Sequence, residues 1–110
     1  MYFLKELLTK TIELGASDLH LTVGLPPTVR CNGKLIQLGN KKLFPDDVEK
    51  FSREILEEKY DEYIKEGEFD TSYSVEGIGR FRVNIFKQRN SDAIAIRVIA
   101  LKIPNLDDLK

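Results

Sequence analysis

The spacing of apolar residues along the first third of the chain changes near residue 15. Up to that point they recur every three or four positions, which predicts an amphipathic helix that ends at Gly15. From Asp18 the period is two, and apolar residues alternate with polar ones up to Val23, which predicts a half-buried strand. After a Gly-Leu-Pro-Pro break, Asn32-Gly33 predicts a tight hairpin turn between two further strands. This part of the chain therefore predicts a helix followed by three strands.

The rest of the chain repeats that order. Pro45, followed by two aspartates, suits the start of a helix, although Phe44 before it has no side-chain oxygen to act as a cap. The helical period continues with a possible break before Tyr60, and Gly67 ends it. Three alternating segments follow, around residues 68–75, 80–86 and 93–99. Helix, three strands, helices and three strands predict an α+β domain: a mostly antiparallel sheet of about six strands with helices on one face.

The last two strands form a hairpin whose register can be predicted. The turn falls near Arg89-Asn90, and one sheet face must bury the apolar sets of both strands, so Val83 is expected opposite Ile96. The same register places Arg82 opposite Arg97 on the other face. Like charges directly opposite each other on neighbouring strands lower the stability of the fold by roughly 0.2–1 kcal/mol.

Two interpretations of this arginine pair are open. An anion such as phosphate, which fits the planar arginine fork, would relieve the repulsion if it bound between the two side chains. Alternatively, both arginines are solvated or pair with acids such as Asp70 or Glu76. The residue pattern alone favours the second interpretation, because most exposed charges are simply part of the surface.

A polar quartet, Ser17, Asp18, His20 and Arg30, marks the first strands. Ser17 and His20 are three residues apart, and on a strand such residues face opposite sides, so they do not form a nucleophile and its base. Asp18 and His20 share a face and are able to orient one another as an acid–base pair. Without a nucleophile or metal nearby, an exposed polar face or a docking surface is the favoured interpretation.

Composition narrows the function classes further. The chain has 110 residues, enough for one domain with a core, and its net charge of −1 gives no electrostatic reason to expect nucleic acid or an anionic membrane as partner. No segment approaches the roughly 20 continuous apolar residues of a membrane span.

One cysteine, Cys31, and one histidine exclude an internal disulfide and a Cys/His metal cluster. The phosphate-binding pattern GxxxxGK[ST] is absent. A cytosolic, metal-free domain that does not activate a nucleoside triphosphate by itself is predicted.

Three segments together resemble a known family. These are GASDLHLTVGLPPTVRCNGKL, EGEFDTSYSVEGIGRFRVNIF, and AIAIRVI with the IPNLDDL that follows it. They are similar to the N-terminal domain of the PilT family of type IV pilus retraction (twitching motility) ATPases, which belongs to the secretion ATPase superfamily. GASDLHL with GLPP is fairly specific to this group, whereas GRFRVN is shared more widely with pilus-assembly and type II secretion ATPases. The resemblance covers essentially the whole chain.

The resemblance implies a PAS-like domain over residues 1–102 and the start of an interdomain linker at residues 103–110. It further implies a homohexamer in which a RecA-like domain, carrying the Walker motifs, follows this one. ATP and Mg would then belong to the parent protein, with no cofactor in this fragment, which is expected to be inactive alone. Implied partners are the RecA-like domains of the same and neighbouring subunits and an inner-membrane pilus platform protein. The implied location is cytoplasmic, peripheral to the inner membrane through the pilus machinery.

The family also implies roles for individual residues. Arg82 and Arg97 match the arginines that close over nucleotide held by the RecA-like domain, with Arg80 as a third candidate. Asp18 and His20, together with Arg30, would form part of the contact with the neighbouring RecA-like domain. One departure is the Phe44-Pro45 helix start, where a capping Thr or Ser is usual.

Other functions fit the sequence as well. One is the N-terminal domain of a pilus-extension or type II secretion ATPase. Another is a free-standing PAS-like sensor that binds a small ligand inside its own core, for which a buried cavity with convergent polar groups is expected.

Overall fold

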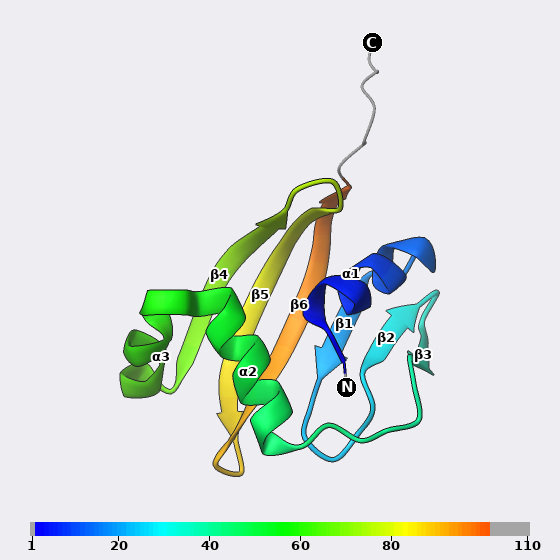
Figure 1. Ribbon diagram of the computed structural model, residues 1–110. Helices are drawn as coiled ribbons and strands as arrows, with labels where there is room; N and C mark the ends of the chain where they lie inside the picture. Colours follow the sequence, from blue (N-terminus) through cyan, green and yellow to red (C-terminus); the bar gives the residue numbers. More distant parts are fainter. Residues whose placement is uncertain (1, 102–110) are drawn as a thin grey trace.

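A six-stranded antiparallel sheet organises the computed structural model, which describes residues 2–101. Strand order across the sheet is β3-β2-β1-β6-β5-β4, and each neighbouring pair is antiparallel. Figure 1 shows the helices on one face of this sheet. In chain order the elements are α1 (Leu4–Glu13), β1 (Asp18–Leu21), β2 (Thr28–Cys31), β3 (Lys34–Gln37), α2 (Pro45–Leu56), the 3-10 turn η1 (Glu57–Lys59), α3 (Tyr60–Glu66), β4 (Glu68–Val75), β5 (Gly79–Gln88) and β6 (Ser91–Leu101). The predicted α+β class is confirmed.

The register predicted for the last hairpin is confirmed. Val83 pairs with Ile96, and Arg82 pairs with Arg97. The connecting turn is at Arg89 and Asn90, whose φ angles of 54° and 68° are the positive values that a two-residue hairpin turn requires. The pairing is irregular between Arg80 and Phe81, because Arg80 pairs with Ala100 while Phe81 pairs with Val98. One extra residue in β6, Ile99, is therefore accommodated as a bulge.

The core lies between the sheet and the helices. Because strand side chains alternate, the apolar set of the central strands points to the helix-bearing face and is buried, while the polar set points to the opposite, open face. In the edge strands the apolar set is half-buried in β4, and all four residues of β3 are exposed. The fully buried side chains of the sheet are contributed mainly by Leu19, Leu21, Val29, Phe81, Val83, Ile85, Ile94 and Ile96. Helices α1 and α2 cover them with Leu4, Leu7, Leu8, Val48, Phe51 and Ile55.

The middle of the chain is helical with the predicted break. No side chain caps the start of α2 from position 44, as expected, but the Asp47 carboxylate accepts a hydrogen bond from the Phe44 backbone N–H at 2.8 Å. The break is η1, which begins at Glu57 with the unusual backbone angles φ 53° and ψ −121°. Gly67 ends α3 in the left-handed conformation with φ 84°.

Two sequence predictions differ from the structure or fall outside it. The first strand was predicted to reach Val23 but ends at Leu21, because the chain turns at residues 22–25 and Val23 makes a separate parallel bridge to Leu43. The domain boundary at residue 102 and the linker at 103–110 lie outside the described residues.

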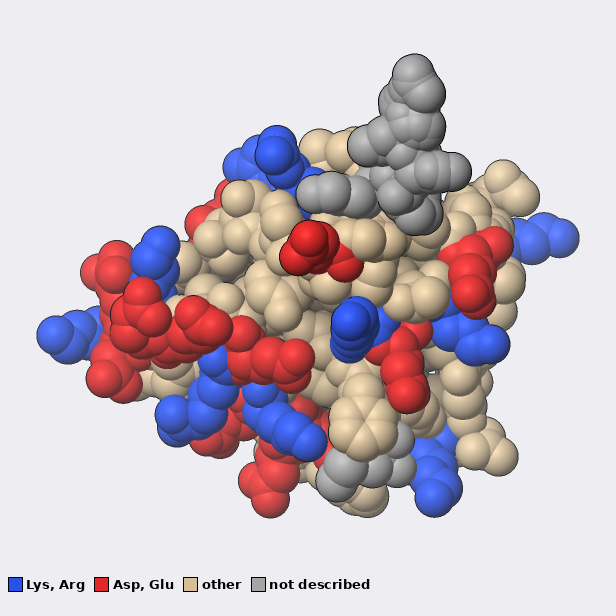
Figure 2. Space-filling view, turned by 45° about the horizontal axis from the view of Figure 1, so that its top comes forward, with Lys and Arg blue, Asp and Glu red and all other residues tan. Residues whose placement is uncertain are grey.

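Charge is mixed over the surface in view in Figure 2. Acidic and basic side chains are interspersed there, in keeping with the net charge of −1. This view therefore offers no uniformly basic surface of the kind that binds nucleic acid. Within residues 2–101 no helix combines the length and the apolar character needed to cross a bilayer.

Candidate functional site

A row of charged residues crosses the open face of the sheet through four adjacent strands. Asp18 on β1 is paired with Arg30 on β2 at one side and with Arg97 on β6 at the other. Arg97 in turn is paired with Arg82 on β5. Across the sheet the charges therefore read positive, negative, positive, positive. The one like-charge contact in the row is the arginine pair predicted from the sequence.

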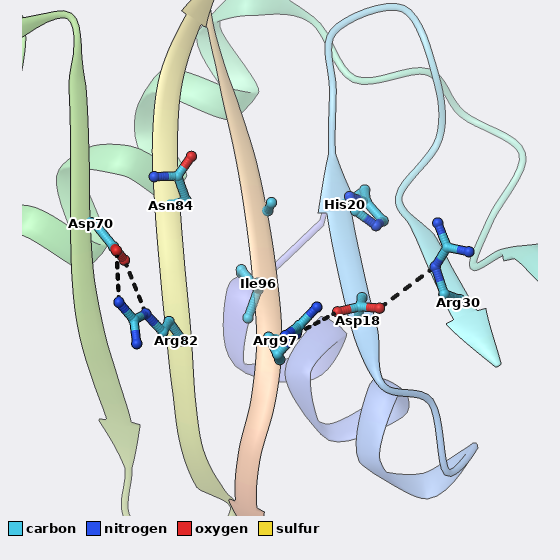
Figure 3. Close-up of a pocket in the computed structure, with 9 residues that line it drawn as sticks. Asp18, His20, Arg30, Asp70, Arg82, Asn84, Ile96 and Arg97 are labelled. Atoms are coloured by element: carbon cyan, nitrogen blue, oxygen red, sulfur yellow. Dashed lines mark hydrogen bonds and ion pairs between the residues drawn. The ribbon is translucent and has the colours of Figure 1, made fainter. Parts of the chain in front are cut away.

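The neighbouring row on the same face is uncharged except at its end. It runs from His20 on β1 through Ala95 on β6 and Asn84 on β5 to Asp70 on β4. Ala95 has the smallest side chain of this row, so the surface is hollowed at the centre of the sheet. The two rows line an open groove with a volume of about 550 Å³. Figure 3 shows its residues, with the helices behind the sheet.

Both arginines of the pair are held by carboxylates. Arg82 donates two hydrogen bonds to Asp70, from Nη2 at 2.9 Å and from Nε at 3.4 Å. The Arg82 hydrogen bond also keeps the pKa of the Asp70 carboxyl below its usual value. Arg97 donates from Nε to Asp18 at 3.4 Å (Figure 3). Both arginines therefore pair with acids in this structure, and Asp70 is one of the two acids named from the sequence.

Asp18 has more partners than any other acid of the groove. Its second carboxylate oxygen lies 3.6 Å from Arg30 Nε and accepts a hydrogen bond from the Ser17 hydroxyl at 3.0 Å. Its side chain is only 15 % exposed, whereas those of Arg82 and Arg97 are 66 % and 74 % exposed. The guanidinium groups of Arg82 and Arg97 are therefore exposed to solvent, whereas the Asp18 carboxylate is mostly covered.

The strand order brings together two sets of residues that were assigned to separate sites from the sequence. Asp18, His20 and Arg30, predicted as an interface, lie in the same groove as Arg82 and Arg97, because β1 sits between β2 and β6. Arg80 does not line this groove; it lies beside Ser74 and Ala100 in a separate, smaller hollow past the β-bulge. Of the groove's other residues, Asn84 and Ala95 form a cross-strand pair next to the two arginines.

The groove is suited to binding an anion. It contains three arginines and two aspartates, giving a net charge of +1 with His20 neutral. Asn84 adds an amide donor, and arginine forks fit the oxygens of phosphate or carboxylate. Within residues 2–101 no group of three or more His, Cys, Asp or Glu side chains is placed to hold a metal ion. The polar groups of the groove converge on an open surface.

A second polar cluster lies at the other end of the sheet and is buried. The Asp92 carboxylate, in a residue only 4 % exposed, is 2.9 Å from Lys87 Nζ and accepts hydrogen bonds from the Tyr63 hydroxyl at 2.7 Å and the Tyr60 hydroxyl at 3.3 Å. Burial and the Asp92 charge raise the pKa of Tyr60 to about 12. This cluster ties α3 to the β5–β6 hairpin. It was not singled out from the sequence.

Comparisons with known proteins identify relatives over nearly the whole chain. No family model matches it. The type IV pilus ATPase PilU of Pseudomonas aeruginosa is 34 % identical over 107 residues, which are 96 % of this chain and 28 % of PilU. The type IV pilus retraction ATPase PilT of the same species is 34 % identical over 108 residues, covering 94 % of this chain and 30 % of PilT. The chain thus spans about 30 % of the length of these relatives.

Solved structures agree with these relatives. A crystal structure of the pilus retraction motor PilT with bound ADP superposes with a TM-score of 0.84 and 40 % identity, covering 99 % of this chain and 32 % of that one. The Legionella pneumophila ATPase DotB, at 22 % identity and a TM-score of 0.77, shares the fold. Sequence and fold together show that the chain is homologous to the N-terminal region of the PilT and PilU type IV pilus ATPases.

Proposed function

We propose that this chain is the domain of a pilus retraction ATPase that closes over ATP held by a RecA-like domain. The observation that carries the proposal is the pair of adjacent arginines, Arg82 and Arg97, which are largely exposed on a sheet face that none of the helices within residues 2–101 covers. A face of this kind is available to another domain. Homology to PilT, whose crystal structure contains ADP, supports a nucleotide as the anion that the arginines meet.

In this proposal the chain binds and neutralises phosphate and leaves bond breaking to its partner domain. Arg82 and Arg97 lie opposite each other on neighbouring strands, and when both turn toward one nucleotide they stabilise negative charge as it develops on the transferred phosphoryl group. That stabilisation exists only while the two domains are closed, so it couples domain movement to the state of the nucleotide. The RecA-like domain would supply the phosphate-binding loop and the Mg²⁺ that accompanies ATP.

The assembly that this implies is a homohexamer in the cytoplasm. Each open face would contact RecA-like domains of its own and neighbouring subunits, and closure around the ring would move the inner-membrane platform protein that disassembles the pilus. PilT is named as a retraction ATPase, which favours retraction over the extension and type II secretion motors considered from the sequence.

Turnover in an ATPase that contains this domain tests the proposal. Arg82→Ala and Arg97→Ala are each expected to lower kcat by about 100-fold or more, the order found when one donor to a developing charge is removed. Both side chains are exposed, so the urea midpoint is expected to change little. Arg53→Ala is the matched control, because Arg53 lies on α2, on the helix-bearing face, and its loss leaves the groove intact. Unchanged turnover in both groove variants would remove these arginines from the reaction.

A further inference from the structure

Neither arginine of the pair presents an unpartnered charge to the groove. Asp70 binds Arg82 through two hydrogen bonds, and Asp18 binds Arg97 through one. A phosphate group that approaches these arginines must therefore replace a carboxylate that is already there. The proposed function names the arginines but gives no role to the two aspartates.

We propose that Asp18 and Asp70 are internal counter-ions that phosphate displaces. In the empty groove the two carboxylates hold the arginines in fixed positions, and a polyphosphate takes over the guanidinium groups when it enters over Ala95. This inference deepens the proposed function, because it concerns the same arginines and identifies what competes with the nucleotide for them.

The exposure of the ion pairs makes the exchange inexpensive. Arg82 and Asp70 are 66 % and 45 % exposed, and ion pairs in solvent contribute little to stability because water solvates both partners when they separate. A phosphate chain carries more charge than a carboxylate and offers several oxygens to the arginine fork. It also contacts both arginines at once, so a single anion relieves the repulsion between Arg82 and Arg97 that two separate carboxylates only offset.

The two aspartates differ in what happens to them after release. Asp70 stands 45 % exposed at the edge strand β4, so water replaces Arg82 as its partner. Asp18 is only 15 % exposed, yet it does not lose all its partners, because Arg30 and the Ser17 hydroxyl remain on its other oxygen. Arg97 can leave Asp18 without stranding a partly covered charge. Arg30 thus has a positioning role in the exchange.

The geometry of the second row provides the space that an anion needs. Ala95 lies between His20 and Asn84 in the pairing and is the neighbour of Asn84 across the β5–β6 ladder. A larger side chain at position 95 would fill the centre of the groove without changing any charge. Ala95→Leu therefore tests whether the anion enters here.

Binding of inorganic tripolyphosphate to the 110-residue chain measures the exchange directly. In calorimetric titrations at low salt, Asp70→Asn is expected to lower the dissociation constant about 10-fold, since it removes the competing charge at contact distance from Arg82. Glu76→Gln is the matched control: it neutralises another acid of the β4–β5 hairpin, in its turn, outside the groove, and is expected to change the constant less than 2-fold. Asp18→Asn is expected to lower the dissociation constant as Asp70→Asn does. Adding Ala95→Leu to either variant is expected to abolish this increase in affinity.

Arginine side-chain NMR provides the second measurement. Tripolyphosphate is expected to move the Nε–Hε resonances of Arg82 and Arg97 and to leave that of Arg53 in place. The proposed displacement is overturned if Asp70→Asn binds tripolyphosphate no more tightly than Glu76→Gln does. It is also overturned if Asp70→Asn keeps its higher affinity when Ala95→Leu is added. Should Asp18→Asn unfold, Asp70→Asn decides alone, because Asp70 is exposed and has one partner.

The exchange and the proposed function fail in different ways. Tighter tripolyphosphate binding by Asp70→Asn, together with unchanged turnover of the Arg82 and Arg97 variants, would support the exchange and refute nucleotide closure. Unchanged tripolyphosphate binding by Asp70→Asn, together with lowered turnover of the Arg82 and Arg97 variants, would refute the exchange and support nucleotide closure.

Discussion

Asp92 is the buried charged side chain among residues 2–101, and its surroundings explain how it stays charged. Burial alone would raise the pKa of its carboxyl, but hydrogen bonds from Lys87 and Tyr63 outweigh that effect, and the pKa is lowered. The two tyrosines come from α3 and Lys87 from β5, so this carboxylate fixes the helix against the end of the hairpin. Its role is in stability, at a distance from the groove.

Replacing Asp92 is expected to be costly. Asp92→Asn removes the charge that Lys87 pairs with and one of the acceptors that the buried tyrosine hydroxyls share, so we expect a loss of about 3 kcal/mol in the free energy of unfolding. Urea denaturation at pH 7 measures this loss. Asp70→Asn is the exposed control and is expected to leave the urea midpoint nearly unchanged. An Asp92→Asn midpoint equal to that of the control would show that the cluster contributes nothing.

The pH dependence of that loss has a definite sign. Because the folded-state pKa of Asp92 lies below its ordinary value of 3.8, the carboxylate stabilises the fold at pH values above about 4. The contribution declines as the pH falls through the folded-state pKa. The stability difference between the natural chain and Asp92→Asn is therefore expected to be full at pH 6 and to shrink toward pH 3.

At the residue scale, the arginine pair could be predicted and its partners only in part. The opposition of Arg82 and Arg97 follows from a period of two and a short turn, both of which are local in sequence. The contact of Arg97 with Asp18 joins residues 79 positions apart and depends on β1 inserting between β2 and β6. No local signal specifies that pairing, so Asp18 and His20 had been assigned to a separate surface.

At the scale of elements, the junction between α2 and η1 carries backbone strain. Glu57 has a φ of 53° with a ψ of −121°, a combination that glycine adopts readily and a residue with a Cβ does not. The break before Tyr60 could be predicted from the fading helical period, but the conformation of the junction could not, because glutamate gives no sign of it. A glycine at this position would have marked the turn in the sequence.

Relief of that strain gives a prediction with an unusual sign. Glu57→Gly is expected to raise the free energy of unfolding by roughly 1 kcal/mol, because the gain from unstrained backbone exceeds the entropy that glycine adds to the unfolded chain. Glu58→Gly is the control at the next position, where φ is not positive, and is expected to be destabilising. Thermal and urea unfolding of both variants give the comparison. Destabilisation by both would mean that Glu57 is held without strain.

At the scale of the whole molecule, the sheet has one covered and one open face, and its function is expected on the open one. The sequence predicted this division, because alternation in β5 and β6 separates an apolar set from a polar set. It did not predict the order of the strands, since the first three strands join the last three through β1 and β6, which are far apart in the chain. That order brings the first polar segment and the arginine pair into one groove.

A groove of this composition implies that the chain binds nucleotide weakly when it is alone. Each of its three arginines is paired with a carboxylate, and ATP must displace the carboxylates that hold Arg82 and Arg97. The 110 residues also contain no GxxxxGK[ST] loop to hold the phosphates. We expect ATP to bind the isolated chain with a dissociation constant of about 1 mM or weaker, equivalent to about −4 kcal/mol, and we expect no hydrolysis.

Calorimetry and phosphate release at several protein concentrations test both expectations. The double variant Arg82→Ala and Arg97→Ala, prepared identically, controls for a contaminating ATPase, whose activity would persist in it. Phosphate release that scales with the natural chain and disappears in the double variant would show that the domain hydrolyses ATP itself, and the division of labour proposed between the two domains would then be wrong.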